Sequence, residues 1–395
     1  MTEQEQTAQA IEKSLRYVKE NLFCPRTNLI HDHKFGDWRK LPKPEEIAAL
    51  CPNPGGYGTG MEDCMINTGS LMDAMITRVK ETRSEEDLAF LHALTDGLCR
   101  NAEAGKDGFL PRGRSPWDGE SHYPDSSRDQ YTLFLYALHL YLNSGFATTE
   151  EHRRIHDAVI HIAERAIRNV NAETGYDLLR EDGRKTISTQ MWGNALCNHE
   201  VSRLPMIYLC AWHVSGDERY LSHYRALREE MYSRLLPMTD YWHVYCVHQM
   251  QISLQVLTDL DPDPGWKDKF QAVMLAAAQY CITCIPRVRK KLEDTSPYRD
   301  EFLSFRNTAL IPWARQIDQE LPAFHPNRPG LDLYFDLWDA AHILFCNALA
   351  GSPDTNAAFA FTNEVLCGID FEHHVTGAPT QFLQAYYTWK SHCKQ

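Results

Sequence analysis

The sequence predicts an all-α protein, built as an (α/α) toroid or barrel of about six or seven helical hairpins. Apolar residues recur at three- and four-residue spacing along most of the chain, which is the periodicity of amphipathic helices. Convincing alternating strands are missing from the sequence. Helices rich in polar and aromatic residues alternate with ordinary amphipathic helices, as expected when inner and outer helices alternate. The alternative is an irregular all-α bundle.

The predicted helices are separated by clusters of Gly, Pro, Asn, Asp and Ser, which mark turns. They span residues 8–20, 61–80, 86–101, 127–144, 150–169, 188–212, 217–236, 241–260, 266–285, 300–316, 331–350, 355–367 and 379–393. The inner helices are those that begin near residues 61, 127, 188 and 241. Since no segment has the composition of a linker, we expect residues 1–395 to form a single catalytic domain.

Composition and charge exclude several classes of function. The 395 residues are 43% hydrophobic and 24% charged, which is typical of a soluble globular protein. The net charge of −13 argues against nucleic-acid binding, which requires a basic face. No apolar stretch is long enough to span a membrane, and the polar N-terminus does not resemble a signal peptide. We therefore expect a cytoplasmic protein without membrane contact, or a periplasmic or secreted one if a signal was removed.

The sequence also predicts that no metal or cofactor is needed. Most of the 12 cysteines lie in apolar helical stretches, and unpaired buried thiols suit a reducing compartment. Cys281 and Cys284 form a single CxxC motif without a second pair, which we interpret as helix packing. His243 and His248 are five residues apart, off the i, i+4 spacing of helical metal ligands, and no HExxH motif occurs.

The most informative segment is the predicted helix over 188–212, which is mostly apolar. Gln190, Asn194 and Asn198 recur at i, i+4 and i+8, so they share one helical face that ends beside His199. Buried amides cost free energy unless each is hydrogen-bonded. The stripe predicts a helix that lines a wet cavity; the alternative is a satisfied core network without chemistry.

A long loop before the helix over 127–144 supplies candidate substrate ligands. A guanidinium fork suits a carboxylate, and aromatic rings can stack on sugars. Long loops without secondary structure are often functional, although salt bridges within the loop are an alternative explanation. The candidates are Arg112, Arg114, Trp117, His122, Tyr123 and Arg128.

Three further segments carry polar or aromatic candidates. Asn67 shares a helical face with Asp63 and Ser70, where it either lines the cavity or holds neighbouring loops. A second set falls within a span of eight residues on the predicted inner helix over 241–260. A third lies in a loop where a guanidinium favours ionisation of the neighbouring phenol. These two sets are Tyr241, His243, Tyr245 and His248, and then Tyr298 and Arg299.

This combination of residues suits β-elimination on a uronic acid. The reaction removes the C5 proton beside the carboxylate and expels the C4 oxygen. An amide, an imidazolium or an arginine must first neutralise the carboxylate, and a tyrosine or histidine then takes the proton. The implied partner is an anionic uronic-acid oligosaccharide or polysaccharide.

The Asn198-His199 pair, followed by the aromatic-rich segment YWHVYCVHQ, resembles the α/α-toroid alginate and glucuronan lyases of polysaccharide lyase family 38. The resemblance implies that Asn198 and His199 neutralise or orient the carboxylate. It also implies a tyrosine as base and acid, with Tyr298 first and Tyr245 or Tyr241 as alternatives. Arg299 or Arg234 would support that tyrosine.

Other functions remain open at this point. A glycoside hydrolase on the same fold, such as a glucuronidase or an unsaturated-glucuronyl hydrolase, needs two carboxylic residues across the sugar bond. A glycan-binding toroid without turnover and a sugar epimerase are further alternatives. The carboxylates available to a hydrolase in these segments are Asp63, Asp118, Asp125 and Asp129.

Overall fold

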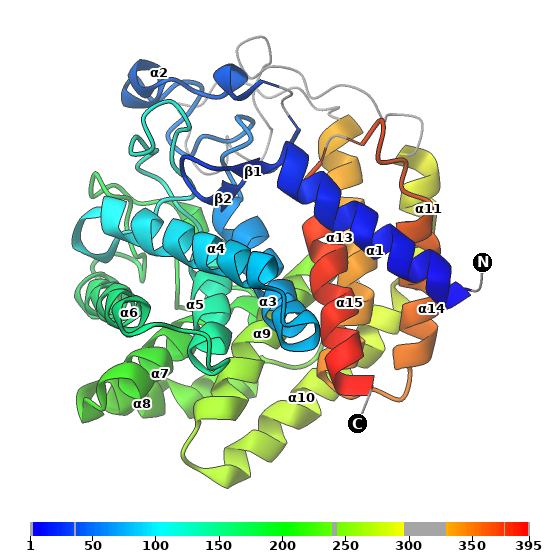
Figure 1. The fold of residues 1–395 in the computed structure, drawn as a ribbon. Coiled ribbons are helices and arrows are strands. Elements are labelled where there is room, and N and C mark those ends of the chain that lie inside the picture. The colour runs from blue at the N-terminus through cyan, green and yellow to red at the C-terminus, as the bar shows by residue number, and fades with distance from the viewer. Residues whose placement is uncertain (1–2, 35–36, 239–242, 296–328, 375, 394–395) are drawn as a thin grey trace.

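The computed structural model describes residues 3–34, 37–238, 243–295, 329–374 and 376–393 (Figure 1). This part of the chain is mostly helical, as predicted, and its one small sheet pairs β1 (Phe23–Cys24) with β2 (Leu29–Ile30) in antiparallel fashion. The predicted helix over 300–316 lies outside the described residues. The helices are α1 (Glu3–Asn21), α2 (Pro44–Ala48), α3 (Cys64–Thr82), α4 (Glu85–Ala104), α5 (Arg128–Leu142), α6 (Thr149–Asn169), α7 (Arg203–Ser215), α8 (Glu218–Arg234), α9 (Val244–Leu260), α10 (Pro264–Thr283), α11 (Ile285–Thr295), α13 (Pro329–Leu349), α14 (Thr355–Cys367) and α15 (Pro379–Cys393).

Two kinds of helix alternate along the chain, as the sequence predicts. Helices α3, α5, α7 and α9 bury most of their side chains, whereas α4, α6, α8 and α10 each keep a polar face exposed. The buried helices contact one another: α3 packs against α5, α5 against α7 and α9, and α9 against α13. Helix α13 packs against α15, and α15 returns to α3 (Figure 1). Helices α4, α8, α10 and α14 cover this buried set from outside.

The two kinds of helix also begin differently. The outer helices α4, α6, α8 and α10 have side-chain caps, in which Ser84, Thr148, Asp217 and Asp263 accept a backbone N–H bond. Such a cap stabilises a helix by about 0.5–2 kcal/mol. The N-cap residues of α3, α5, α7 and α9 make no such side-chain bond. The buried helices therefore begin without the local cap that their neighbours have.

The predicted helix over 188–212 is wrong in its first half. Residues 187–189 and 198–200 form short 3₁₀ turns, and the α-helix begins only at Arg203. Gly193 has a φ of +98°, in the left-handed region that interrupts a right-handed helix. Pro205 is tolerated only in the first turn of a helix, where its missing N–H is not needed. The amides of Gln190, Asn194 and Asn198 therefore do not share a helical face.

Segments from the two ends of the described chain are joined beside α3. His33 forms a β-bridge with Thr376, and the backbone N–H of Gly377 donates to the carbonyl of Asp32 at 2.6 Å. The hydroxyl of Tyr17 in α1 donates to the carbonyl of His374 at 3.1 Å. Helix α1 lies across α15 (Figure 1). Asp32 is thus held between the N-terminal segment, α3 and the C-terminal segment.

The CxxC motif lies at the end of α10. Cys281 lies in α10 and Cys284 directly follows it, and both are buried and unpaired, as expected for helix packing. Among the described residues, no helix combines the length and the apolar character that crossing a membrane requires.

We predict that Gly69→Ala destabilises the protein by about 1–3 kcal/mol through overpacking. A Cβ at Gly69 in α3 would lie 2.9 Å from the carbonyl oxygen of Leu133 in α5, so one backbone would have to move. Chemical denaturation of the variant measures the loss. Gly265→Ala is the matched control, since its Cβ would meet only the Asp263 carboxylate at 3.4 Å. An unchanged unfolding free energy for Gly69→Ala would contradict this close approach of α3 and α5.

Candidate active site

The candidate active site is a cavity of about 390 Å³ at the starts of the buried helices. It is bordered by the first residues of α3, α5, α7 and α9 and by the first half of α13. Its wall is both charged and aromatic. The lining residues are Tyr57, Glu62, Asp63, Ile66, Arg112, Ser127, Arg128, Asp129, Ser188, His199, Glu200, Arg203, His243, Tyr245, Cys246, Phe335 and Trp338.

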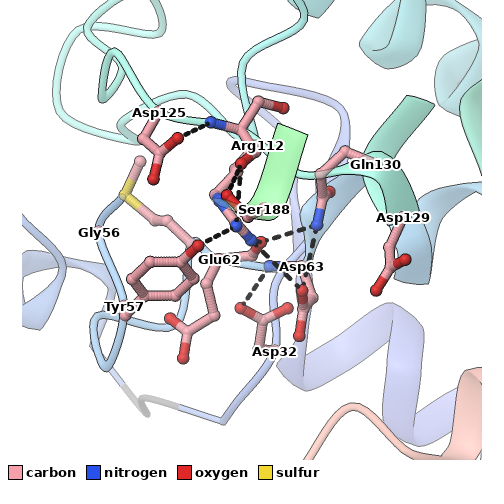
Figure 2. A network of polar contacts seen from close by, with 12 residues as sticks. Asp32, Gly56, Tyr57, Glu62, Asp63, Arg112, Asp125, Asp129, Gln130 and Ser188 are labelled. Atoms are coloured by element: carbon pink, nitrogen blue, oxygen red, sulfur yellow. Dashed lines mark hydrogen bonds and ion pairs between the residues drawn. The ribbon is translucent and has the colours of Figure 1, made fainter. Parts of the chain in front are cut away.

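Asp63, the residue that precedes α3, is a carboxylic acid whose pKa is raised towards neutrality. Burial and the charge of Glu62 outweigh the opposing charge of Arg112, so the pKa of Asp63 rises to about 7. Its Oδ1 accepts from Nε2 of Gln130 at 3.1 Å and lies 3.9 Å from Nη1 of Arg112. Figure 2 shows Asp63 among Asp32, Arg112 and Gln130. A buried acid of this kind can donate a proton to a substrate.

Asp129, in the first turn of α5, has the opposite behaviour. Burial opposes its ionisation, but the charges of Arg203 and Arg128 outweigh burial and hold the pKa of Asp129 below its usual value. Arg203, at the start of α7, is 2% exposed and donates to Oδ1 of Asp129. One cavity therefore contains two carboxyl groups whose environments shift their pKa values in opposite directions, which is the pattern of an acid and base pair.

A second ion pair flanks the cavity. Arg128 donates to Oε1 of Glu200 and, through Nη1, to the carbonyl of Gln190 at 3.0 Å. The charges of Arg128 and Arg203 outweigh burial and lower the pKa of Glu200. His199 is buried beside this pair, and burial lowers its pKa to about 4. At neutral pH its imidazole is uncharged and can accept a proton, but it does not neutralise a carboxylate by charge.

A buried hydrogen-bond network holds Asp63 in place. Oδ2 of Asp32 accepts from the backbone N–H of Asp63 at 3.0 Å, and its Oδ1 accepts from Asn67 at 2.8 Å. Burial and the nearby charges of Asp63 and Glu62 raise the pKa of Asp32 well above its usual value. Asn67 also accepts from Thr380 in α15 at 3.0 Å. The first turn of α3 is therefore fixed by contacts with two distant parts of the chain.

Part of the predicted site comes together in this cavity. Arg112 lines the cavity and donates to the carbonyl of Glu62 at 3.0 Å and to the hydroxyl of Tyr57 (Figure 2). Asn67 does not line the cavity and is connected to the lining residue Asp63 through Asp32. Of the predicted residues, those that line the cavity are Arg112, Arg128, His199, His243 and Tyr245, together with Asp63 and Asp129 from the hydrolase alternative.

The other loop candidates serve structural contacts elsewhere. Arg114 is buried and donates to the carbonyls of Gly119 and Thr27. Trp117 donates to the carbonyl of Leu41, and the hydroxyl of Tyr123 donates to the carbonyl of Cys51. His122 pairs with Glu181 at 3.1 Å. Four further candidates also fall outside the lining: Asp118 in an exposed turn, the buried Asp125, the half-buried Gln190 and the exposed Asn194.

Three more predicted residues lie away from the cavity, and three lie outside the described residues. Asn198 is half-buried and does not reach the lining, in contrast to its neighbour His199. His248 is buried in the core, stacked on His342 with ring centroids 3.8 Å apart. Arg234 donates to the carbonyls of Gly193 and Leu196. The structure does not describe Tyr241, Tyr298 and Arg299.

Several lining residues were not predicted from the sequence. Glu200 and Arg203 follow His199 closely. An acidic residue before a helix start is ordinary, and no pattern in the sequence marks Arg203 as part of a site. Phe335 and Trp338 lie on α13, whose apolar pattern indicates only core packing. Among the described residues, no group of three or more His, Cys, Asp or Glu side chains is arranged to hold a metal ion.

Comparison with known proteins gives no relative from which a role could be transferred. No protein-family model, curated protein or solved structure matches the chain. The functional argument therefore depends on the geometry of the cavity.

Proposed function

We propose that the protein is a glycoside hydrolase built as an α/α toroid, with Asp63 as general acid and Asp129 as its ionised partner. The toroid is supported by the succession of contacts from α3 through α5, α9, α13 and α15 back to α3. The hydrolase is supported by one observation above all: Asp63 and Asp129 line the same cavity with pKa values shifted in opposite directions.

The proposed reaction is cleavage of a glycosidic bond by water. Asp63 donates its proton to the glycosidic oxygen as that bond breaks. The carboxylate of Asp129 either removes a proton from the attacking water or attacks the anomeric carbon itself. Arg203 keeps Asp129 ionised during substrate binding, because it supplies a buried positive charge beside it. The products are two shorter sugars, one with a new reducing end.

A uronic acid is the proposed substrate class. Three arginines line the cavity, each beside a carboxylate of the chain. A guanidinium group has five N–H donors, so each could also donate to a substrate carboxylate. The starts of α3, α5, α7 and α9 border the cavity without side-chain caps, so their positive helix ends favour an anion. Tyr245 and Phe335, with ring centroids 5.6 Å apart, provide an apolar wall for a sugar ring.

The first experiment compares two products on one panel of glucuronate, mannuronate and guluronate oligosaccharides, including pre-unsaturated ones. Hydrolysis releases reducing ends without a rise in ultraviolet absorbance, and on unsaturated oligomers the absorbance falls. Carboxyl-reduced oligosaccharides are the matched control and should be cleaved poorly if the arginines bind the substrate carboxylate. Binding to members of the panel without cleavage of any of them would contradict the hydrolase and favour a glycan-binding protein.

The second candidate is β-elimination, as in the alginate and glucuronan lyases that the sequence resembles. One observation favours it: His199 is an uncharged imidazole in the cavity and could remove a proton. Tyr245 is less suited, because the neighbouring Cys246 and burial raise its pKa well above the usual value. A rise in ultraviolet absorbance on saturated uronates, lost in His199→Gln and kept in Asp63→Asn, would establish the lyase instead.

We predict that activity falls as the pH rises through about 7. The pKa of Asp63 is raised to about 7, so its proton is present below that pH and is lost above it. Asp129 has a lowered pKa and stays ionised down to acidic pH. The profile of kcat/KM against pH should therefore have a broad acidic plateau and an alkaline limb near neutrality. Activity that instead increases through this range would make Asp63 a base and contradict its assignment as the acid.

A further inference from the structure

A second cavity, of about 440 Å³, lies around the β1–β2 hairpin and shares no lining residue with the candidate active site. Its wall combines a thiol, an imidazole and an exposed aromatic ring, since Trp38 is 39% exposed. The proposed function makes no use of these groups. The lining residues are Glu20, Asn21, Leu22, Phe23, Cys24, Pro25, Arg26, His31, Asp37, Trp38, Leu41 and Pro116.

The hairpin brings Cys24 and His31 to this cavity. Cys24 pairs with Leu29 across the two strands, and His31 directly follows β2. Cys24 is only partly buried, whereas His31 is 3% exposed. Nδ1 of His31 lies 3.4 Å from the carbonyl oxygen of Gly60 and 3.7 Å from Sγ of Cys64. Its Nε2 has almost no exposed surface. The His31 ring is also a hydrogen-bond partner of the Cys24 thiol, so the imidazole and the thiol act together in the cavity wall.

The surroundings of Cys24 stabilise its thiolate. Burial by itself would raise the pKa of Cys24, but His31 and Thr27 stabilise the negative sulfur and lower the pKa to about 6. The thiolate is the nucleophilic form of cysteine. Other thiols behave differently: burial and the charge of Glu200 raise the pKa of Cys197, although Cys197 is exposed. Cys24 therefore combines access from a cavity with a neighbouring imidazole and a stabilised thiolate.

We propose that Cys24 is a covalent modification site, at which the thiolate beside His31 reacts with a peroxide that enters the hairpin cavity. The sulfur attacks one peroxide oxygen, so an S–O bond forms as the O–O bond breaks. The leaving oxygen takes a proton and departs as water or an alcohol. The sulfur is oxidised by two electrons to a sulfenic acid, and the peroxide is reduced. This proposal does not depend on the hydrolase.

The test measures labelling rates of individual cysteines in the folded, full-length protein. Limiting iodoacetamide is added at about pH 7, and peptides are quantified by mass spectrometry. A thiol with a pKa near 6 is mostly thiolate at that pH, whereas one above the usual value of about 8.5 is ionised by only a few per cent. Since nucleophilicity falls with pKa, we expect Cys24 to react about tenfold faster than Cys197.

Hydrogen peroxide followed by a dimedone probe tests the chemistry itself. The sulfenic-acid adduct should appear on Cys24 before Cys197 or Cys367, disappear in Cys24→Ser and persist in Cys197→Ser. His31→Gln should slow alkylation of Cys24 towards the rate of Cys197; the comparison within the wild-type protein keeps the test valid if this variant folds poorly. Equal alkylation of Cys24 and Cys197 in the wild type, or a first adduct elsewhere, would overturn the proposal.

Discussion

Replacing Asp63 with asparagine is expected to reduce kcat by about 10²–10⁴-fold, which is the usual contribution of a proton-transfer group. The amide keeps the shape of the carboxyl group and can still accept from Gln130, but it cannot donate a proton to a leaving oxygen. The expected outcome also includes stability: the variant should unfold at the same denaturant concentration as the wild type or a higher one. The reason is that burial and the nearby carboxylates of Glu62 and Asp32 make ionised Asp63 unfavourable, as its raised pKa indicates, whereas the amide does not ionise.

The matched control is Asp118→Asn. Asp118 is exposed and accepts from the backbone N–H groups of Glu120 and Ser121 in a surface turn, away from the cavity. Its replacement should leave kcat within about twofold of the wild type, since surface substitutions rarely affect a distant site. An Asp63→Asn variant that keeps full activity would remove Asp63 from the mechanism. An inactive variant that has also lost its folded spectrum would instead show that Asp63 is needed for folding, so both measurements are made on the same sample.

The second large effect is expected for Arg203→Gln. Removing one partner of a fully buried ion pair typically costs roughly 3–5 kcal/mol, because the other charge is left without compensation. The Asp129 side chain is 29% exposed, so screening by solvent reduces the expected loss to about 2–3 kcal/mol. Without Arg203, the pKa of Asp129 should rise, and the acidic limb of the activity profile should move to higher pH.

Two controls separate the charge of Arg203 from its packing. Arg203→Lys keeps the positive charge and should retain most of the acidic activity while losing some stability. Arg219→Gln breaks an exposed pair with Glu164, in which the arginine is 52% exposed, and should change stability by less than about 1 kcal/mol. If Arg203→Gln left both the unfolding free energy and the acidic limb unchanged, Asp129 would not depend on Arg203 for its charge.

The sequence predicts the helical character well because most helices have a strong apolar periodicity and clear turns between them. It fails over residues 190–202, where apolar spacing continues although the backbone is not α-helical. Two residues carried the missing signal: Gly193 with its left-handed φ, and Pro205, which fits only near a helix start. Apolar periodicity indicates which residues are buried, but it does not by itself determine the backbone conformation.

The candidate site is only partly predictable for a similar reason. Arg128 reaches the cavity because it begins α5, and His199 because it lies shortly before α7. Arg112 reaches it from the long loop, where it donates to the Glu62 carbonyl and the Tyr57 hydroxyl. Arg114 has the same side chain as Arg112 and, like Trp117, belongs to the same loop, yet the hydrogen bonds of both residues fix the loop itself. Residue type and neighbourhood in sequence do not distinguish these roles. The distinction depends on the direction in which each side chain leaves the backbone, and the packed fold determines that direction.

The hydrogen bonds around Asp32 have a consequence for the order of events during synthesis. Asp32 is translated early, yet it is held by Gly377, and Asn67 is held by Thr380, more than three hundred residues further along the chain. The hydrogen-bond network of Asp32 and Asn67 that holds Asp63 can therefore be completed only after α15 has emerged from the ribosome. A nascent chain that lacks this helix would carry all of its cavity-lining acids without the framework that sets their ionisation. If the proposed function holds, activity would be acquired late in synthesis rather than growing with the chain.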